Sequence, residues 1–260
     1  MATYLDEIVA SHRARAAVDD RPLAALDAAA RAAPPPRPFA TALRGDGTGV
    51  TLIAEIKRRS PSKGDLAADL DPAVLARAYA AGGAGCLSVL TDAAFFAGSL
   101  VDLETARAAV ELPVLRKDFT VCERDVLDAR AMGADAVLLI VAVLDDDELT
   151  RLGRLAASLA MAALVEVHDE AELARALGAG ATIVGVNQRD LHSFAVDPER
   201  AARVAGAMPD GVVRVAESGI RDRRDVERLA SAGFDAALVG ETLVTAADPC
   251  AATKSLLGRA

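Results

Sequence analysis

The sequence predicts an α/β fold, specifically a (β/α)8 (TIM) barrel with an N-terminal helical extension. After residue 50, short apolar runs that are typical of buried strands alternate with amphipathic segments that are typical of helices. Glycine recurs where four predicted helices end, at Gly82, Gly133, Gly178 and Gly233, and an apolar run follows each time. Eight strands with intervening helices, at a spacing of roughly 25 residues, form the pattern of such a barrel.

An open, doubly wound sheet is the alternative fold. No G-x-G-x-x-G motif follows the first predicted strand, which weakens the dinucleotide-binding version of that fold.

The 260 residues are expected to form one domain, with residues 1–49 as the helical extension and residues 50–260 as the barrel. Residues 3–18 have helical spacing, which places His12 on the extension. The alanine-rich residues 23–33 predict a second helix, and a proline-rich segment ends it.

Strands and helices are expected to alternate through the barrel. Strands are predicted at 51–56, 86–90, 113–116, 136–141, 163–167, 182–186, 212–216 and 236–239. Helices are predicted at 72–81, 100–110, 123–132, 146–160, 170–177, 198–207, 223–232 and 249–257.

Composition excludes several functional classes. The apolar fraction of 52% and charged fraction of 26% are typical of globular proteins, and the longest apolar run, residues 136–144, is too short to cross a bilayer. The N-terminus has early acidic residues and no signal-peptide core, so we expect a cytoplasmic protein. A net charge of −9 argues against general binding to nucleic acid or to a membrane surface. We expect a monomer, although nothing in the sequence argues against an oligomer.

Cysteine and histidine are too few and too scattered for a disulfide framework or a metal centre. Three widely spaced cysteines form no C-x-x-C pair, and only three histidines are present, so no metal site is predicted. His168 and His192 are expected in loops or helix caps rather than in catalysis.

Only four of the 29 basic residues are lysines: Lys57, Lys63, Lys117 and Lys254. Codon usage is a sufficient explanation of the arginine excess. Lysine nevertheless differs from arginine in that its pKa can be tuned for proton transfer.

Charged and polar residues collect where the predicted strands end. Glu55 and Lys57 lie two residues apart at the end of the first strand, so their side chains leave it on the same face. Other predicted strands end at Lys117, Glu166, Asn187 with Arg189, Glu217 with Ser218, and Gly240 with Glu241. Because active sites of these barrels lie at the carboxyl ends of the strands, the side chains are expected to converge on an acid–base site.

The last two strand ends are expected to hold a phosphate group. Ser218, Gly219 and Gly240 are small residues, and the loops after strands 7 and 8 commonly bind phosphate through backbone N–H groups. A phosphorylated small molecule is therefore the expected partner.

These motifs resemble the indole-3-glycerol phosphate synthase family. The similarity lies in I-A-E-I-K-R-R-S-P-S-K-G at 53–64, V-L-R-K-D-F at 114–119, L-V-E-V-H at 164–168, G-V-N-Q-R-D-L at 185–191 and A-E-S-G-I at 216–220. L-S-V-L-T-D at 87–92, followed by two phenylalanines and G-S-L, fits as well. The resemblance covers nearly the whole chain, and Gln188 is a small departure from it.

The resemblance implies a cofactor-free reaction of tryptophan biosynthesis. It converts 1-(2-carboxyphenylamino)-1-deoxyribulose 5-phosphate to indole-3-glycerol phosphate by ring closure, decarboxylation and dehydration. By resemblance, Lys117 is the general acid of ring closure, Glu166 the base, and Lys57 steers the substrate carboxylate. Lys57 is also a candidate for the acid of the dehydration step, and the sequence does not determine how the two lysines divide that step. Glu55 and Asn187 orient these groups and bind substrate hydroxyls, and Ser218 assists.

The resemblance also implies a set of substrate-binding residues. Ser60, Gly219, Gly240 and Glu241 are expected around the phosphate. Phe96, Phe119 and Leu139 are expected to form the apolar wall for the anthranilate ring. We expect Arg189 to pair with Glu217 or with another site carboxylate.

Two other functions are compatible with the sequence. One is a Schiff-base aldolase on the same barrel, with Lys117 as the nucleophile. The other is a barrel that binds a phosphorylated ligand without turnover. The cysteine and aspartate pair of phosphoribosylanthranilate isomerase is not found at the appropriate strand ends.

Overall fold

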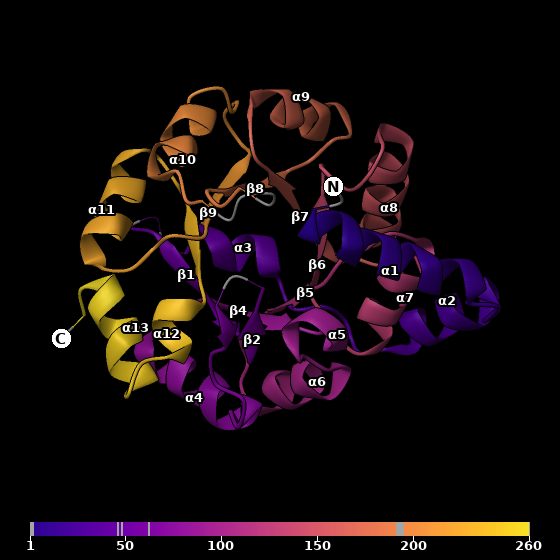
Figure 1. Cartoon of the computed structure of the whole chain (residues 1–260), viewed down its shortest axis with the longest axis horizontal. Coiled ribbons are helices and arrows are strands. Elements are labelled where there is room, and N and C mark those ends of the chain that lie inside the picture. The colour runs from indigo at the N-terminus through magenta and orange to yellow at the C-terminus, as the bar shows by residue number, and fades with distance from the viewer. Residues whose placement is uncertain (1–2, 46, 48, 62, 191–194, 260) are drawn as a thin grey trace.

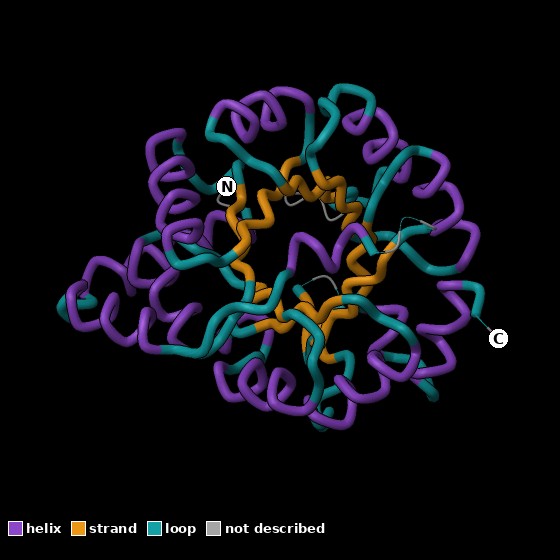
Figure 2. Tube along the Cα trace, turned by 180° about the vertical axis from the view of Figure 1, so that it is seen from behind, coloured by secondary structure: helices purple, strands orange, loops and turns teal. Residues whose placement is uncertain are grey.

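The computed structural model describes residues 3–45, 47, 49–61, 63–190 and 195–259. Eight parallel strands close into a barrel in the order β1-β10-β9-β8-β7-β6-β5-β4, and helices surround it (Figures 1 and 2). The predicted barrel is thereby confirmed. The barrel strands are β1 (Thr51–Ile56), β4 (Cys86–Leu90), β5 (Val114–Lys117), β6 (Ala136–Ile140), β7 (Ala162–Val167), β8 (Ile183–Asn187), β9 (Val213–Glu217) and β10 (Ala236–Val239).

The outer layer consists of helices that follow the strands. They are α4 (Pro72–Gly82), α6 (Leu100–Ala109), α7 (Glu123–Ala131), α8 (Asp146–Ser158), α9 (Glu170–Gly178), α10 (Pro198–Ala205), α11 (Arg223–Ser231) and α13 (Pro249–Leu257). Aspartate side chains cap most of these helices at their N-termini. Asp145 and Asp222, for example, each accept a hydrogen bond from a backbone N–H of the first turn.

Two separate apolar layers form the core. Inward-facing side chains such as Ile53, Leu115 and Leu164 fill the barrel, whereas their neighbours on the strands pack against the helices. The alternation follows from the two-residue period of a strand. It determines which strand residues can reach the site at the barrel mouth.

The extension consists of three helices: α1 (Tyr4–Val18), α2 (Leu23–Ala32) and α3 (Phe39–Arg44). Phe39 and Leu43 of α3 are fully buried with the residues inside the barrel, and α3 crosses the barrel opening in Figure 2. α2 packs on α7, and α1 lies beside α8, where Arg13 pairs with Glu148 (Figure 1).

Three short elements were not predicted: α3, α5 (Ala93–Phe96) and α12 (Glu241–Val244). The small hairpin of β2 (Arg59–Ser60) and β3 (Gly64–Asp65) was also missed. Such elements are too short to show a hydrophobic period.

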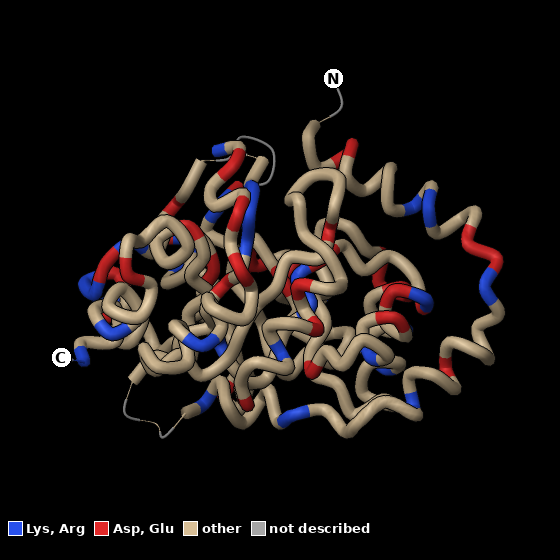
Figure 3. Tube along the Cα trace, turned by 90° about the horizontal axis from the view of Figure 1, so that it is seen from below, with Lys and Arg blue, Asp and Glu red and all other residues tan. Residues whose placement is uncertain are grey.

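Acidic and basic residues are interspersed along the chain (Figure 3). In the part of the chain that the structure describes, no helix is long and apolar enough to cross a bilayer.

Candidate active site

A cavity of about 710 Å³ opens at the carboxyl ends of the barrel strands. All of the predicted site residues except Leu139 line it: Glu55, Lys57, Ser60, Phe96, Lys117, Phe119, Glu166, Asn187, Arg189, Glu217, Ser218, Gly219, Gly240 and Glu241. The convergence expected from the strand ends is therefore observed.

Lys117 lies at the centre of the polar floor. Its Nζ donates to Oε2 of Glu217 at 2.7 Å and to Oε2 of Glu166 at 2.9 Å. Both carboxylates are almost fully buried, with 2% of each side chain exposed. Asn187 donates from Nδ2 to the other oxygen of Glu166 at 3.0 Å, which fixes the plane of that carboxylate.

The three groups have strongly perturbed pKa values. Burial alone lowers the pKa of Lys117, but the facing carboxylates of Glu166 and Glu217 raise it above its ordinary value. Burial likewise opposes ionisation of Glu166, yet Lys117 and its other donors lower the pKa of Glu166 to about 2.

Glu217 behaves in the opposite way. Burial and the nearby charge of Glu166 raise the pKa of Glu217 to about 7, despite the ammonium of Lys117. The difference has a structural cause, because Oε1 of Glu217 is buried and has no hydrogen-bond partner among the described residues. Of the two carboxylates that share Lys117, Glu217 is thus the one that takes up a proton more readily.

A second ion pair lies at the end of β1. Nζ of Lys57 donates to Oε1 of Glu55 at 2.5 Å, and both side chains are largely buried. Gly240 lies directly against this pair: a Cβ at position 240 would come within 2.3 Å of Oε1 of Glu55. A side chain at position 240 would therefore displace the Glu55–Lys57 pair.

Phe96 and Phe119 form an aromatic side of the cavity, with ring centroids 6.5 Å apart. The assignment of Leu139 to this wall was wrong. Leu139 faces outward and packs in the layer between the barrel and the helices, whereas Leu138 and Ile140 line the cavity. The error is one residue of strand register, which moves a side chain to the opposite face.

The opposite side of the cavity is built from backbone and small residues. Ser218 and Gly219 both have left-handed backbone conformations, with φ of 68° and 74°. The side chain of Gln188 donates to the carbonyl oxygen of Ser218 at 2.7 Å and holds this turn. Oγ of Ser60 is buried and has no hydrogen-bond partner among the described residues, so a ligand oxygen could bind it.

The loop after β1 reaches this side of the cavity. Nζ of Lys63 lies 3.7 Å from Oε1 of Glu241, the first residue of α12. Arg189 also lines the cavity, and its backbone N–H donates to Oδ1 of Asn187 at 3.0 Å. Glu217, which we expected as a partner of Arg189, binds Lys117. His192 lies outside the described residues.

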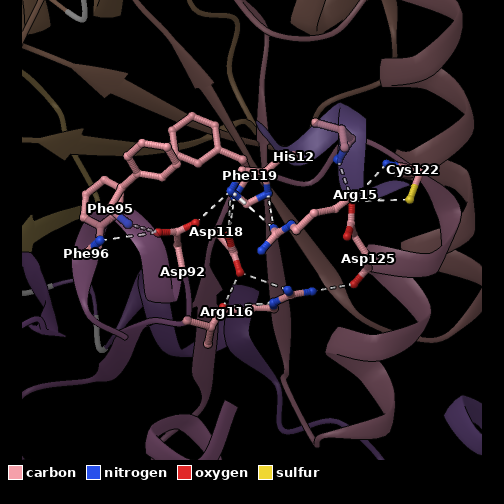
Figure 4. A network of polar contacts seen from close by, with 12 residues as sticks. His12, Arg15, Asp92, Phe95, Phe96, Arg116, Asp118, Phe119, Cys122 and Asp125 are labelled. Atoms are coloured by element: carbon pink, nitrogen blue, oxygen red, sulfur yellow. Dashed lines mark hydrogen bonds and ion pairs between the residues drawn. The ribbon is translucent and has the colours of Figure 1, made fainter. Parts of the chain in front are cut away.

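A buried polar network, shown in Figure 4, joins the extension to the aromatic side of the cavity, and it was not predicted from the sequence. Nε2 of His12 lies 2.9 Å from Oδ2 of Asp92 and 3.8 Å from Oδ1 of Asp118. Oδ1 of Asp92 accepts from the backbone N–H groups of Phe95 and Phe96, and so caps α5.

The hydrogen-bond partners of His12 indicate the role of each of its ring nitrogens. A guanidinium nitrogen of Arg15 lies 2.7 Å from Nδ1 of His12. Because a guanidinium only donates, Nδ1 accepts and Nε2–H donates to Asp92. Asp118 accepts hydrogen bonds from Arg116 (Figure 4) and from the hydroxyl of Thr91. Atoms of His12, Asp92 and Asp118 that could ligate a metal ion lie within 4.8 Å of one another. Hydrogen bonds within the protein account for this arrangement.

An acid–base enzyme on a (β/α)8 barrel is the class of protein that this arrangement defines, because lysines and carboxylates share one cavity at the strand ends. The chain belongs to the indole-3-glycerol phosphate synthase family, whose model matches residues 5–256. The resemblance found in the motifs is thus confirmed.

Curated relatives support the same family. An indole-3-glycerol phosphate synthase of Parafrankia sp. is 53% identical over 247 residues, covering 94% of this chain and 91% of the relative. One of Nocardioides sp. is 52% identical over 258 residues and covers 98% of both chains. Among solved structures, a thiamine phosphate pyrophosphorylase from Pyrococcus furiosus matches with a TM-score of 0.60. It covers 80% of this chain and 94% of that one at 19% identity, so it supports the fold alone.

Proposed function

We propose that the protein converts 1-(2-carboxyphenylamino)-1-deoxyribulose 5-phosphate to indole-3-glycerol phosphate, carbon dioxide and water in tryptophan biosynthesis. It would act as a carbon–carbon lyase of the carboxy-lyase type. Family membership supports the assignment. The observation that carries it is the position of Lys117, which is buried in the cavity between Glu166 and Glu217.

The first step forms a carbon–carbon bond. The ring carbon that bears the carboxylate attacks the ribulose carbonyl carbon, and the carbonyl oxygen takes a proton from Lys117. The carboxylates of Glu166 and Glu217 outweigh burial and raise the pKa of Lys117, which favours the protonated form that donates in this step. Lys57, which lies at the mouth with Glu55, steers the substrate carboxylate.

The next steps restore aromaticity. Carbon dioxide leaves, and the electron pair of the broken bond returns to the ring. Dehydration then removes the hydroxyl formed from the carbonyl: the ammonium of Lys57 or of Lys117 protonates the departing oxygen, which leaves as water, while Glu166 takes a proton from the new five-membered ring. All of these changes are redox-neutral, so none of them requires an oxidant, a reductant or a cofactor.

Two sides of the cavity match the two ends of this substrate. Phe96 and Phe119 would hold the anthranilate ring by stacking and apolar contact. The turn at Ser218 and Gly219, with Ser60 and the backbone at Gly240 and Glu241, would bind the phosphate. We propose a cytoplasmic location, which suits a biosynthetic enzyme of this family.

A Schiff-base aldolase would use Lys117 differently, because a lysine nucleophile must be a neutral amine. The two carboxylates on Lys117 favour the ammonium form instead. Borohydride reduction in the presence of a keto-sugar phosphate separates the two reactions. The synthase predicts no covalent adduct on Lys117.

The direct test is an indole fluorescence assay with the carboxyphenylamino deoxyribulose phosphate. The chain contains no tryptophan, so the indole signal of the product stands clear of the protein. We expect the signal to grow with time and with enzyme concentration. Folded protein that gives no signal with authentic substrate would refute the proposal, and binding without turnover would favour the non-catalytic barrel.

A further inference from the structure

His168 connects the carboxylate of Glu166 to the helix layer. It follows β7 directly and lies two residues after Glu166. Nδ1 of His168 is 3.0 Å from Oε2 of Glu172 on α9, and Nε2 is 3.7 Å from Oε1 of Glu166. One imidazole thus lies between two carboxylates, one in the cavity and one outside it.

Only one of the two ring nitrogens of His168 has a hydrogen-bond partner among the described residues. Because the carboxylate of Glu172 is an acceptor, Nδ1 of His168 carries a proton. Nε2 is buried and has no hydrogen-bond partner among the described residues, although it points to an oxygen that already accepts from Asn187. A buried nitrogen is costly when it is left unpaired, and a protonated Nε2 would be stabilised by the charge of Glu166.

The charged groups around His168 come from three elements. Glu166 on β7 and Glu172 on α9 favour the imidazolium, and Arg200 on α10 opposes it. Burial lowers the pKa of His168, but the hydrogen bond to Glu172 and the charge of Glu166 raise it above its ordinary value overall. Reciprocally, His168 is among the groups that lower the pKa of Glu166.

We propose that His168 is a positioning residue for Glu166, holding its carboxylate ionised and oriented toward Lys117 while Glu172 fixes the imidazole ring. The catalytic part of this statement rests on the proposed function, in which Glu166 is the base. The contact between His168 and Glu166 does not rest on it.

A purely structural role is the competing explanation. The backbone N–H of His168 also donates to Oε2 of Glu172 at 2.7 Å, next to the N-cap of α9. If His168 served only this turn, its ring would be independent of Glu166.

Nuclear magnetic resonance with ¹⁵N-labelled histidine separates the two roles without turnover. The chain has only three histidines, so a spectrum of His168→Gln assigns the signals of His168. We expect a proton on Nδ1 and a pKa above 6.5. Glu166→Gln and Glu172→Gln should each lower that pKa, by about one unit. A pKa that Glu166→Gln leaves unchanged would overturn the proposal.

Steady-state kinetics tests the effect on Glu166. His168→Phe removes both nitrogens, and we expect kcat to fall about tenfold with KM within a factor of two, because the base is misplaced. His168→Gln keeps a donor and should recover part of the loss. Glu170→Gln, on the exposed first turn of α9, is the control and should leave kcat unchanged.

The outcomes are distinguishable. Wild-type kcat in folded His168→Phe, or an equal loss in Glu170→Gln, would overturn the positioning role. If His168→Phe does not fold, His168→Gln and the titration decide the question. An enzyme without turnover on authentic substrate would refute the proposed function, whereas the titration would still test the contact between His168 and Glu166.

Discussion

At the scale of residues, the site depends on how one ammonium is shared by two buried carboxylates. Lys117 binds Glu166 and Glu217 at similar distances, yet the two acids differ in their other partners. Glu166 has Asn187 and His168 beside it, whereas Oε1 of Glu217 has no hydrogen-bond partner among the described residues. Different surroundings separate the pKa values of the two acids, which is a common way to divide acid and base roles.

Replacement of Lys117 by alanine is expected to remove most of the turnover. General acid catalysis contributes about 10²–10⁴-fold, so kcat should fall by at least that range while phosphate-end binding persists. Indole fluorescence measures kcat, and displacement of a substrate analogue measures binding. Lys254→Ala on α13, outside the cavity, is the matched control. Turnover close to the wild-type rate in Lys117→Ala would refute its role as the acid.

Glu217 should make stability depend on pH. Its folded pKa of about 7 lies above the ordinary value, so the folded state binds a proton that the unfolded state releases. Its stabilising contribution is therefore present below about pH 4.3 and is lost as the pH rises to about 7. Glu217→Gln should raise Tm relative to wild type more at pH 8 than at pH 5. A difference in Tm that is the same at both pH values would contradict this assignment.

At the scale of elements, glycines set how closely the strands approach the site. Gly185 on β8 makes room for Glu217, since a Cβ at position 185 would lie 2.2 Å from Oε1 of Glu217. Gly240 does the same for Glu55 at the end of β10. The carboxylates of Glu217 and Glu55 thus occupy space that a side chain at position 185 or 240 would fill.

Gly185→Ala should therefore perturb both stability and activity. Overpacking costs about 1–3 kcal/mol, and the displaced Glu217 should lower kcat. Gly178→Ala is the control, because nothing lies within 4 Å of its added Cβ. Chemical denaturation and the fluorescence assay measure the two effects. Equal behaviour of the two variants would contradict the packing argument.

The strand ends were predictable from sequence because charges in apolar runs are conspicuous. Glu55, Lys117 and Glu166 all interrupt or end such runs, and the barrel topology brings them together. Leu139 was misplaced because β6 is apolar on both faces, so its sequence does not show which residues point inward.

At the scale of the whole molecule, both the first and the last helix of the extension pack on the barrel. Phe39 and Leu43 of α3 are buried with the residues inside the barrel, while Tyr4 and His12 of α1 contact Phe95 and Asp92 after β4. There His12 binds Asp92, which caps the turn that bears Phe96. This network could not be predicted, because His12 and Asp92 are 80 residues apart and neither belongs to a local pattern.

Two variants of α1 should differ in their effect. His12→Leu leaves Oδ2 of the buried Asp92 carboxylate without the donor that His12 supplies, which should cost about 1–3 kcal/mol of unfolding free energy. Arg13→Ala breaks an exposed ion pair to Glu148 on α8 and should cost about 0–1 kcal/mol. Urea denaturation measures both values. A larger loss in Arg13→Ala than in His12→Leu would show that the buried network does not anchor α1.

The central claim, that these residues catalyse decarboxylative ring closure without a cofactor, is tested most directly by following the carboxyl carbon. With substrate labelled by ¹³C in the carboxyl group and a chelator present, wild-type protein should release one labelled carbon dioxide for each indole formed. Lys117→Ala should release it at least about 10²-fold more slowly, in step with its lower kcat. Indole formation that requires an added metal or cofactor, or carbon dioxide release that is not matched by indole, would contradict the claim.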